Sequence, residues 1–188
     1  RIMLVYGRPG TERNAFSLIV ASLRLWARHY PQARQWRILS AGEAFAPIDL
    51  GSGCTLHSVG KLSIEAYADL LCRTAVGFSL MVSPHPSYPP LEMAAFGARV
   101  VVNRFANKDL SGVSPLLVSA SPPNPEGFSA ALRTLTQAFD HGETSCMPAN
   151  ASEMVWQGGF LDSCGPGFAW AADVAATLLG DAPAIPAP

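Results

Sequence analysis

Charged side chains are scarce in this chain of 188 residues. They make up 14% of it, against about 25% in an average soluble domain. The 13 basic residues nearly balance the 14 acidic ones, for a net charge of -1, so the strongly basic footprint of a nucleic-acid-binding protein is absent. No apolar run approaches the roughly 20 residues of a membrane-spanning helix. Apolar residues still make up 49% of the chain, which allows a large core and, with so little charge, predicts a sizeable apolar face that is covered by something outside this chain.

Several common site signatures are also missing. The four cysteines, at positions 54, 72, 146 and 164, lack the spacing of a zinc knuckle or a redox pair. We therefore expect reduced, mostly buried cysteines rather than a disulfide framework. The sequence has no dinucleotide-binding Gly-x-Gly-x-x-Gly after its first expected strand, no P-loop and no Gly-x-Ser-x-Gly elbow. It also lacks an Asp-x-Asp metal motif, and no metal or resident cofactor is predicted.

Short runs of branched apolar residues alternate with segments of helical period. The expected strands are 2–6, 37–41, 54–59, 76–82, 99–103 and 116–120, and the expected helices are 14–30, 63–73, 90–96, 126–139 and 168–179. This alternation predicts an α/β fold, a doubly wound, Rossmann-like parallel sheet of about six strands with helices on both faces. We expect residues 1–180 to form one domain and residues 181–188 to be a proline-rich tail.

Three loops at strand ends carry the residues of interest, because ligands of such sheets bind at the carboxyl ends of the strands. Arg8 and Arg13 follow the first strand and precede a helix, where cations are unfavourable unless an anion docks between them. The alternative is a solvated turn in which Glu12 offsets one arginine. Lys61, in Gly60-Lys61-Leu62-Ser63, holds the same place after another strand. The alternative interpretation of Lys61 is an ordinary surface lysine in a turn. Ser63 is the expected N-cap of the helix that follows.

The third loop reads SPHPSYPPLE over residues 83–92. Its four prolines fix the backbone, so its free amides could face a ligand at little entropic cost. Glu92 falls in the short helix that follows. The alternatives are a rigid turn, a solvated His85 and a surface Glu92.

Together the three loops resemble the C-terminal, nucleotide-sugar-binding half of retaining GT-B glycosyltransferases. Gly7-Arg8 with Arg13, then Gly60-Lys61, then PSYPPLEMAAFGARVVV over residues 86–102 follow the order of that family. Pro84 stands where the first of the family's two glutamates would be. The variant is most similar to bacterial rhamnosyltransferases that build rhamnan-type surface polysaccharides, and the resemblance covers residues 2–139.

The resemblance implies a donor site built from these loops, with no certain catalytic residue in this half. The expected site residues are Arg8, Arg13, Lys61, Leu62, His85, Ser87, Tyr88 and Glu92. The cations would bind the donor diphosphate, the amides of Ser87 and Tyr88 would face phosphate or sugar, and Glu92 would accept a hydrogen bond from the ribose.

The resemblance also implies the reaction and its surroundings. A sugar, such as rhamnose from dTDP-rhamnose, would be transferred with retention and without a metal to a glycan acceptor held by a domain preceding Arg1. The full-length enzyme would be cytoplasmic, with peripheral association at the inner face of the membrane. The alternative is a degenerate nucleotide-sugar-binding or interaction module without turnover. The lost first glutamate favours that alternative, whereas Arg8, Lys61 and Glu92 oppose it.

Overall fold

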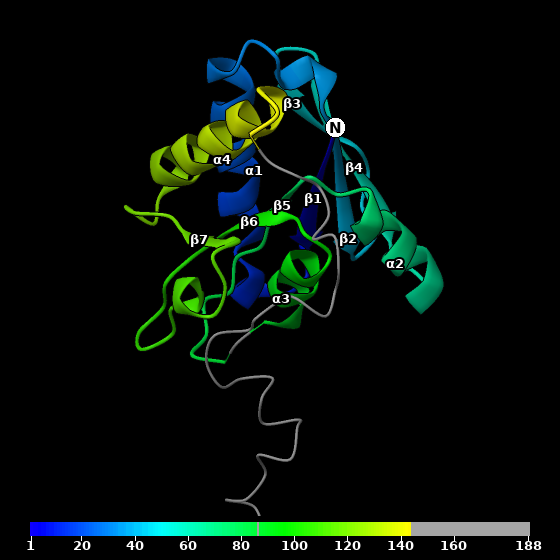
Figure 1. Cartoon of the computed structure of the whole chain (residues 1–188). Helices are drawn as coiled ribbons and strands as arrows, with labels where there is room; N and C mark the ends of the chain where they lie inside the picture. The colour runs from blue at the N-terminus through cyan, green and yellow to red at the C-terminus, as the bar shows by residue number, and fades with distance from the viewer. Residues whose placement is uncertain (86, 144–188) are drawn as a thin grey trace, which may run out of the picture. The chain divides into compact units, whose positions relative to one another are not determined.

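A seven-stranded sheet runs through the part of the chain that the computed structural model describes, residues 1–85 and 87–143 (Figure 1). Its order is β3-β4-β2-β1-β5-β6-β7, and every neighbouring pair is parallel except β3 with β4. The strands are β1 (Ile2–Gly7), β2 (Arg37–Gly42), β3 (Ile48–Gly51), β4 (Cys54–Gly60), β5 (Val76–Phe78), β6 (Arg99–Val102) and β7 (Leu117–Ser119).

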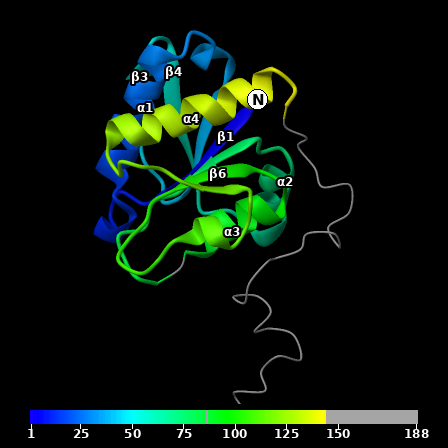
Figure 2. The ribbon, with the colours of Figure 1, turned by 60° about the vertical axis from the view of Figure 1, so that its left-hand side comes forward.

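Helices cover both faces of the sheet. They are α1 (Phe16–His29), α2 (Ile64–Cys72), α3 (Tyr88–Ala95) and α4 (Pro125–Asp140). A Cβ added at Gly77 of β5 would meet Met93 of α3, whereas the ring of the next residue, Phe78, packs on Phe128 of α4 with centroids 5.7 Å apart. Consecutive strand residues point to opposite faces, so α3 and α4 lie on opposite faces. Figure 2 shows α4 with α1 on one side and α3 with α2 on the other.

The predicted α/β fold with its doubly wound parallel sheet is confirmed. The prediction of about six strands missed β3, a four-residue edge strand that pairs antiparallel with β4. The turn between them is tight: Ser52 has a left-handed φ of 55°, and the Gly51 amide donates to the Asp49 carboxylate at 2.9 Å. This strand is short and half-exposed, so it carries too few apolar residues for its pattern to be recognised in the sequence.

Several predicted elements are shorter than expected, and for two of them the structure shows the reason. The helix expected over 14–30 begins at Phe16, because Ala15 takes a left-handed φ of 47° and separates α1 from a preceding 3-10 turn. The strand expected over 76–82 ends at Phe78, because the backbone of Met81 pairs with the side chain of Asn103 instead of a neighbouring strand. The helix expected over 90–96 begins earlier, at Tyr88, with prolines in its first turn.

The remaining expectations are met in part. Cys54 is buried and Cys72 is exposed, both as free thiols, so the prediction of mostly buried cysteines was wrong for Cys72. The other two cysteines, the helix expected over 168–179, the tail and the domain boundary at residue 180 lie outside the described residues. No helix within residues 1–85 and 87–143 is both long and apolar enough to cross a membrane.

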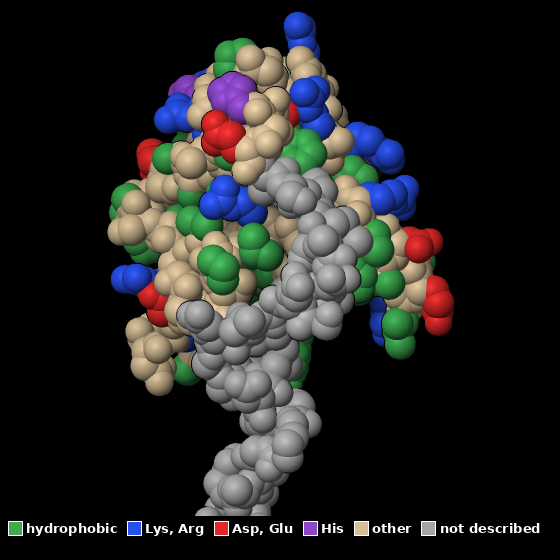
Figure 3. Space-filling model, viewed as in Figure 1, with side chains coloured by type: hydrophobic (Ala, Val, Ile, Leu, Met, Phe, Trp, Pro, Cys, Tyr) green, Lys and Arg blue, Asp and Glu red, His purple; other side chains and the backbone are tan. Residues whose placement is uncertain are grey.

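The surface of the described part does not carry the broad apolar face that the low charge predicted. Its exposed large apolar side chains are Ile64, Val82 and Tyr88. On the face drawn in Figure 3, basic and acidic side chains are interspersed. Large apolar side chains such as Trp26 and Phe128 are instead fully buried between the sheet and its helices.

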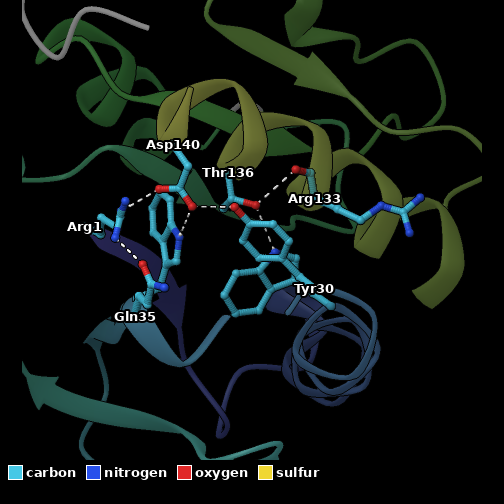
Figure 4. A network of polar contacts seen from close by, with 8 residues as sticks. Arg1, Tyr30, Gln35, Arg133, Thr136 and Asp140 are labelled. Atoms are coloured by element: carbon cyan, nitrogen blue, oxygen red, sulfur yellow. Dashed lines mark hydrogen bonds and ion pairs between the residues drawn. The ribbon is translucent and has the colours of Figure 1, made fainter. Parts of the chain in front are cut away.

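A polar network ties α4 to the edge of the sheet where the parallel strands begin (Figure 4). The Asp140 carboxylate forms an ion pair with Arg1 at 2.6 Å and accepts hydrogen bonds from Tyr30 and, at 3.4 Å, from the Trp36 indole. Burial, followed by the hydrogen bond to Asp140, raises the pKa of Tyr30 to about 12. This network therefore lies at the amino ends of the parallel strands, away from their carboxyl ends.

Candidate functional site

A cavity of about 540 Å³ opens at the carboxyl ends of the central strands. The connection of β1 leads to β2 on one side, whereas that of β5 leads to β6 on the other, so the strand order reverses between β1 and β5. Such a switch point is where open α/β sheets bind ligands. The residues that line the cavity are Tyr6, Arg8, Ala41, Gly42, Lys61, Leu62, Ser63, Ile64, Tyr67, Tyr88, Pro89 and Glu92.

A second, smaller cavity of about 170 Å³ adjoins the first, with Tyr6, Arg8, Tyr88 and Pro89 lining both. The residues found in the smaller cavity alone are Arg13, Asn14, Met81, His85 and Ser87. Each of the eight site residues expected from the sequence therefore lines one of the two cavities. Their roles toward a ligand stay predictions.

The two cavities expose cations that form no ion pair with any described acidic residue. Within residues 1–85 and 87–143, the ion pairs are those of Arg1 with Asp140 and of Arg104 with Asp109. Arg8, Arg13 and Lys61 form none in that part of the chain. Arg8 is partly buried, and Lys61 is exposed beside the first turn of α2. Ser63 caps that helix as predicted, its hydroxyl oxygen accepting from the Ala66 amide at 3.2 Å. Unpaired cations beside helix N-termini suit an anionic ligand.

Hydrogen bonds between loops hold the arginine loop in place. The Val82 amide donates to the Arg13 carbonyl at 2.7 Å, and the Asn14 side-chain amide donates to the Leu80 carbonyl at 3.4 Å. On the other side, the Gly10 amide donates to Glu43 at 2.9 Å. The loop after β1 is thus tied to those after β5 and β2, which brings Arg8 and Arg13 beside Tyr88.

Two glycines allow the close approach of β1 and β2 at the cavity floor. Gly42 has a φ of 126°, and a Cβ there would lie 2.8 Å from the Gly7 carbonyl oxygen. A Cβ at Gly7 would lie 2.2 Å from the Ser40 hydroxyl oxygen. Side chains at either position would push the arginine loop outward.

Side chains of the segment after β6 anchor the loop after β5. Asn103 accepts from the Met81 amide at 2.7 Å and donates to the Met81 carbonyl at 3.1 Å. The Lys108 ammonium donates to the same carbonyl at 2.6 Å, and burial lowers the pKa of Lys108. These bonds replace the strand pairing that Met81 lacks, and they fix the wall of the smaller cavity.

Among the cavity residues that were not expected from the sequence are three with polar side-chain atoms, Tyr6, Asn14 and Tyr67. Asn14 is 1% exposed, and its side-chain oxygen has no hydrogen-bond partner among the described residues. The Tyr67 hydroxyl is also buried and lies beside Glu92; burial and then the Glu92 charge raise the pKa of Tyr67. No group of three His, Cys, Asp or Glu side chains that could hold a metal occurs in the described residues.

Several solved structures share this fold, a glucosyltransferase among them. The catalytic domain of cholesterol-α-glucosyltransferase from Helicobacter pylori matches 76% of this chain and 89% of its own with a TM-score of 0.51 and 15% identity. Anabaena HepE in complex with UDP and glucose matches 92% of this chain and 48% of its own, with a TM-score of 0.62 and 14% identity. OtsA in its apo form matches 82% and 37%, with a TM-score of 0.56 and 11% identity. At these identities the likeness shows the fold alone.

Sequence comparison gives the family. Residues 1–133 match the family described as WsaF, C-terminal domain, and the chain belongs to this family. It is also 38% identical over 154 residues to the O-antigen biosynthesis protein RfbC of Myxococcus xanthus. That match covers 80% of this chain, but the chain spans only 12% of the length of that curated relative.

Proposed function

We propose that this domain binds the nucleotide-sugar donor of a glycosyltransferase that acts in polysaccharide synthesis. The observation that carries the proposal is the meeting of Arg8, Lys61 and Glu92, from three loops far apart in sequence, in one cavity at the switch point of the sheet. The fold that the chain shares with HepE, which was solved with UDP and glucose, and the name of its relative RfbC support it.

The cations bind the diphosphate of the donor, and the carboxylate binds its ribose. Arg8 and Lys61 bind the diphosphate, because a doubly charged group is best held by several cationic donors. In transfer the same cations stabilise the charge that develops on the leaving diphosphate. Glu92 accepts a hydrogen bond from a ribose hydroxyl, as a carboxylate is an acceptor only. Leu62 contributes apolar wall beside Lys61.

The smaller cavity takes the sugar. Arg13, His85 and the backbone amides of Ser87 and Tyr88 surround it, and they supply donors to the sugar or to its phosphate. The unpartnered side-chain oxygen of Asn14 supplies an acceptor for a sugar hydroxyl. The donor in this proposal is dTDP-rhamnose and the transfer retains configuration without a metal. The proline-bearing loop at Pro84 supports a 6-deoxy sugar, which has no 6-hydroxyl to be held.

The acceptor is a glycan bound by a second domain across the open cavity, and the enzyme works in the cytoplasm at the inner face of the membrane. This chain covers 48% of HepE and 37% of OtsA, and such partial coverage supports separate donor-binding and acceptor-binding domains. The isolated 188-residue chain is then expected to bind nucleotide weakly and to transfer no sugar. Full transfer activity from this chain alone would contradict the two-domain proposal.

Titration calorimetry with dTDP and with UDP tests the proposed donor site. A charge-assisted hydrogen bond contributes on the order of 1.5–3 kcal/mol, so Arg8→Ala and Lys61→Ala should each weaken binding roughly tenfold to a hundredfold. Arg34→Ala is the matched control, since Arg34 is exposed in the segment before β2, at the opposite edge of the sheet. Equal affinity in wild type, Arg8→Ala and Lys61→Ala would refute the proposed site.

A further inference from the structure

Tyr67 lies in the wall of the larger cavity, near the start of α2. Its hydroxyl oxygen is buried, and its charged or polar neighbours from the packed elements are Glu92 of α3 and Tyr6 of β1. Glu92 is its side-chain hydrogen-bonding neighbour, but the two groups fall short of the geometry of a full hydrogen bond. A buried hydroxyl without a partner is unfavourable, so this position calls for a reason beyond packing.

The neighbouring carboxylate supplies that reason. Burial and then the Glu92 charge raise the pKa of Tyr67, so the phenol keeps its proton and can only donate toward the carboxylate. Hydrogen bonds of a binding site are often loose without ligand and tighten in the complex. A side-chain hydrogen bond to Glu92 already contributes to the raised pKa of Tyr67, and in the complex it would be a charge-assisted bond of the strong kind.

We propose that Tyr67 is a positioning residue that holds one oxygen of Glu92, so that the other oxygen faces a ribose hydroxyl of the bound nucleotide. An exposed glutamate samples several rotamers, and fixing one of them beforehand reduces the entropy lost on binding. The inference rests on the proposed function, in which Glu92 accepts from the ribose. It adds a residue of α2 to a site otherwise built from strand-end loops and α3.

The test is Tyr67→Phe in the 188-residue chain, which removes the hydroxyl and keeps the ring. We expect dTDP and UDP to bind about three- to tenfold more weakly. Inorganic pyrophosphate, which has no ribose, should bind with the wild-type affinity, whereas a damaged cavity would weaken all three ligands. Tyr30→Phe is the matched control, because Tyr30 also donates to a carboxylate, Asp140, at the opposite edge of the sheet. It should leave all three affinities unchanged.

A double-mutant cycle with Glu92→Ala shows whether Tyr67 acts through Glu92. In the Glu92→Ala background, Tyr67→Phe should change nucleotide affinity by less than about twofold, since coupled residues are not additive. An unchanged nucleotide affinity in Tyr67→Phe, an equal loss for pyrophosphate, or full additivity with Glu92→Ala would each overturn the inference. Absence of nucleotide binding in the wild type would instead overturn the proposed function and this inference with it.

Discussion

Asn103→Ala removes the side chain that replaces strand pairing at Met81. Asn103 is 7% exposed and makes three hydrogen bonds, accepting from the Met81 amide and donating to the carbonyls of Met81 and Arg104. The Met81 carbonyl keeps the bond from Lys108 in the variant, but the Met81 amide loses its partner. Leaving one partly buried donor without a partner and losing two further hydrogen bonds should cost about 2–3 kcal/mol of unfolding free energy.

Thermal unfolding followed by circular dichroism measures this loss. With about 2–4 °C per kcal/mol for a domain of this size, the midpoint should fall by about 4–12 °C. Nucleotide affinity should fall several-fold as well, because Met81 lines the smaller cavity. Asn107→Ala is the control, since Asn107 is exposed in the same segment. A midpoint for Asn103→Ala equal to that of the control would refute the anchoring role.

Three further predictions concern the framework. Asp140→Asn weakens the pairing with Arg1 and should lower the unfolding free energy by about 1–3 kcal/mol in urea, with nucleotide affinity unchanged; a comparable loss of affinity would contradict the separation of network and site. Because the pKa of Tyr30 is raised from 10.0 to about 12 in the folded chain, the unfolded chain releases that proton first, so stability should be intact below pH 10 and decline between pH 10 and 12. Tyr30→Phe should flatten that decline, and an unaltered pH profile would speak against it. Gly42→Ala, at a φ of 126° and with its Cβ 2.8 Å from the Gly7 carbonyl, should lose more than about 1 kcal/mol, and a stability equal to wild type in the same urea titration would count against the close approach.

The loops of the candidate site could be predicted from the sequence because of one general property of parallel sheets. Their carboxyl ends meet at one edge, so Arg8, Lys61 and Glu92 are brought together once the strands before them are known. Exposed loop residues such as these also carry local signals, namely cations at helix starts and prolines that fix a turn. Neither signal depends on how the helices pack.

The residues that were missed depend on that packing. Tyr67 is an ordinary aromatic position of a short helix in the sequence, and it meets Glu92 only because α2 and α3 cover the same face of the sheet. Asn14 was expected inside a helix. It lies in the preceding turn instead, because Ala15 takes a left-handed conformation that an alanine in the sequence does not predict. The end of β5 at Phe78 likewise follows from Asn103, a residue 25 positions away.

The most direct test of the proposed donor site is a titration of the isotope-labelled chain with dTDP and UDP, followed by amide NMR shifts. We expect the shifts to concentrate on residues 7–14, 60–64 and 87–92, three of the segments that line the two cavities. The hollow formed by Arg24, Arg28 and the β3–β4 turn is an internal control, since it also presents two arginines. Shifts concentrated at that hollow, or no shifts at millimolar nucleotide, would contradict a donor site at the switch point of the sheet.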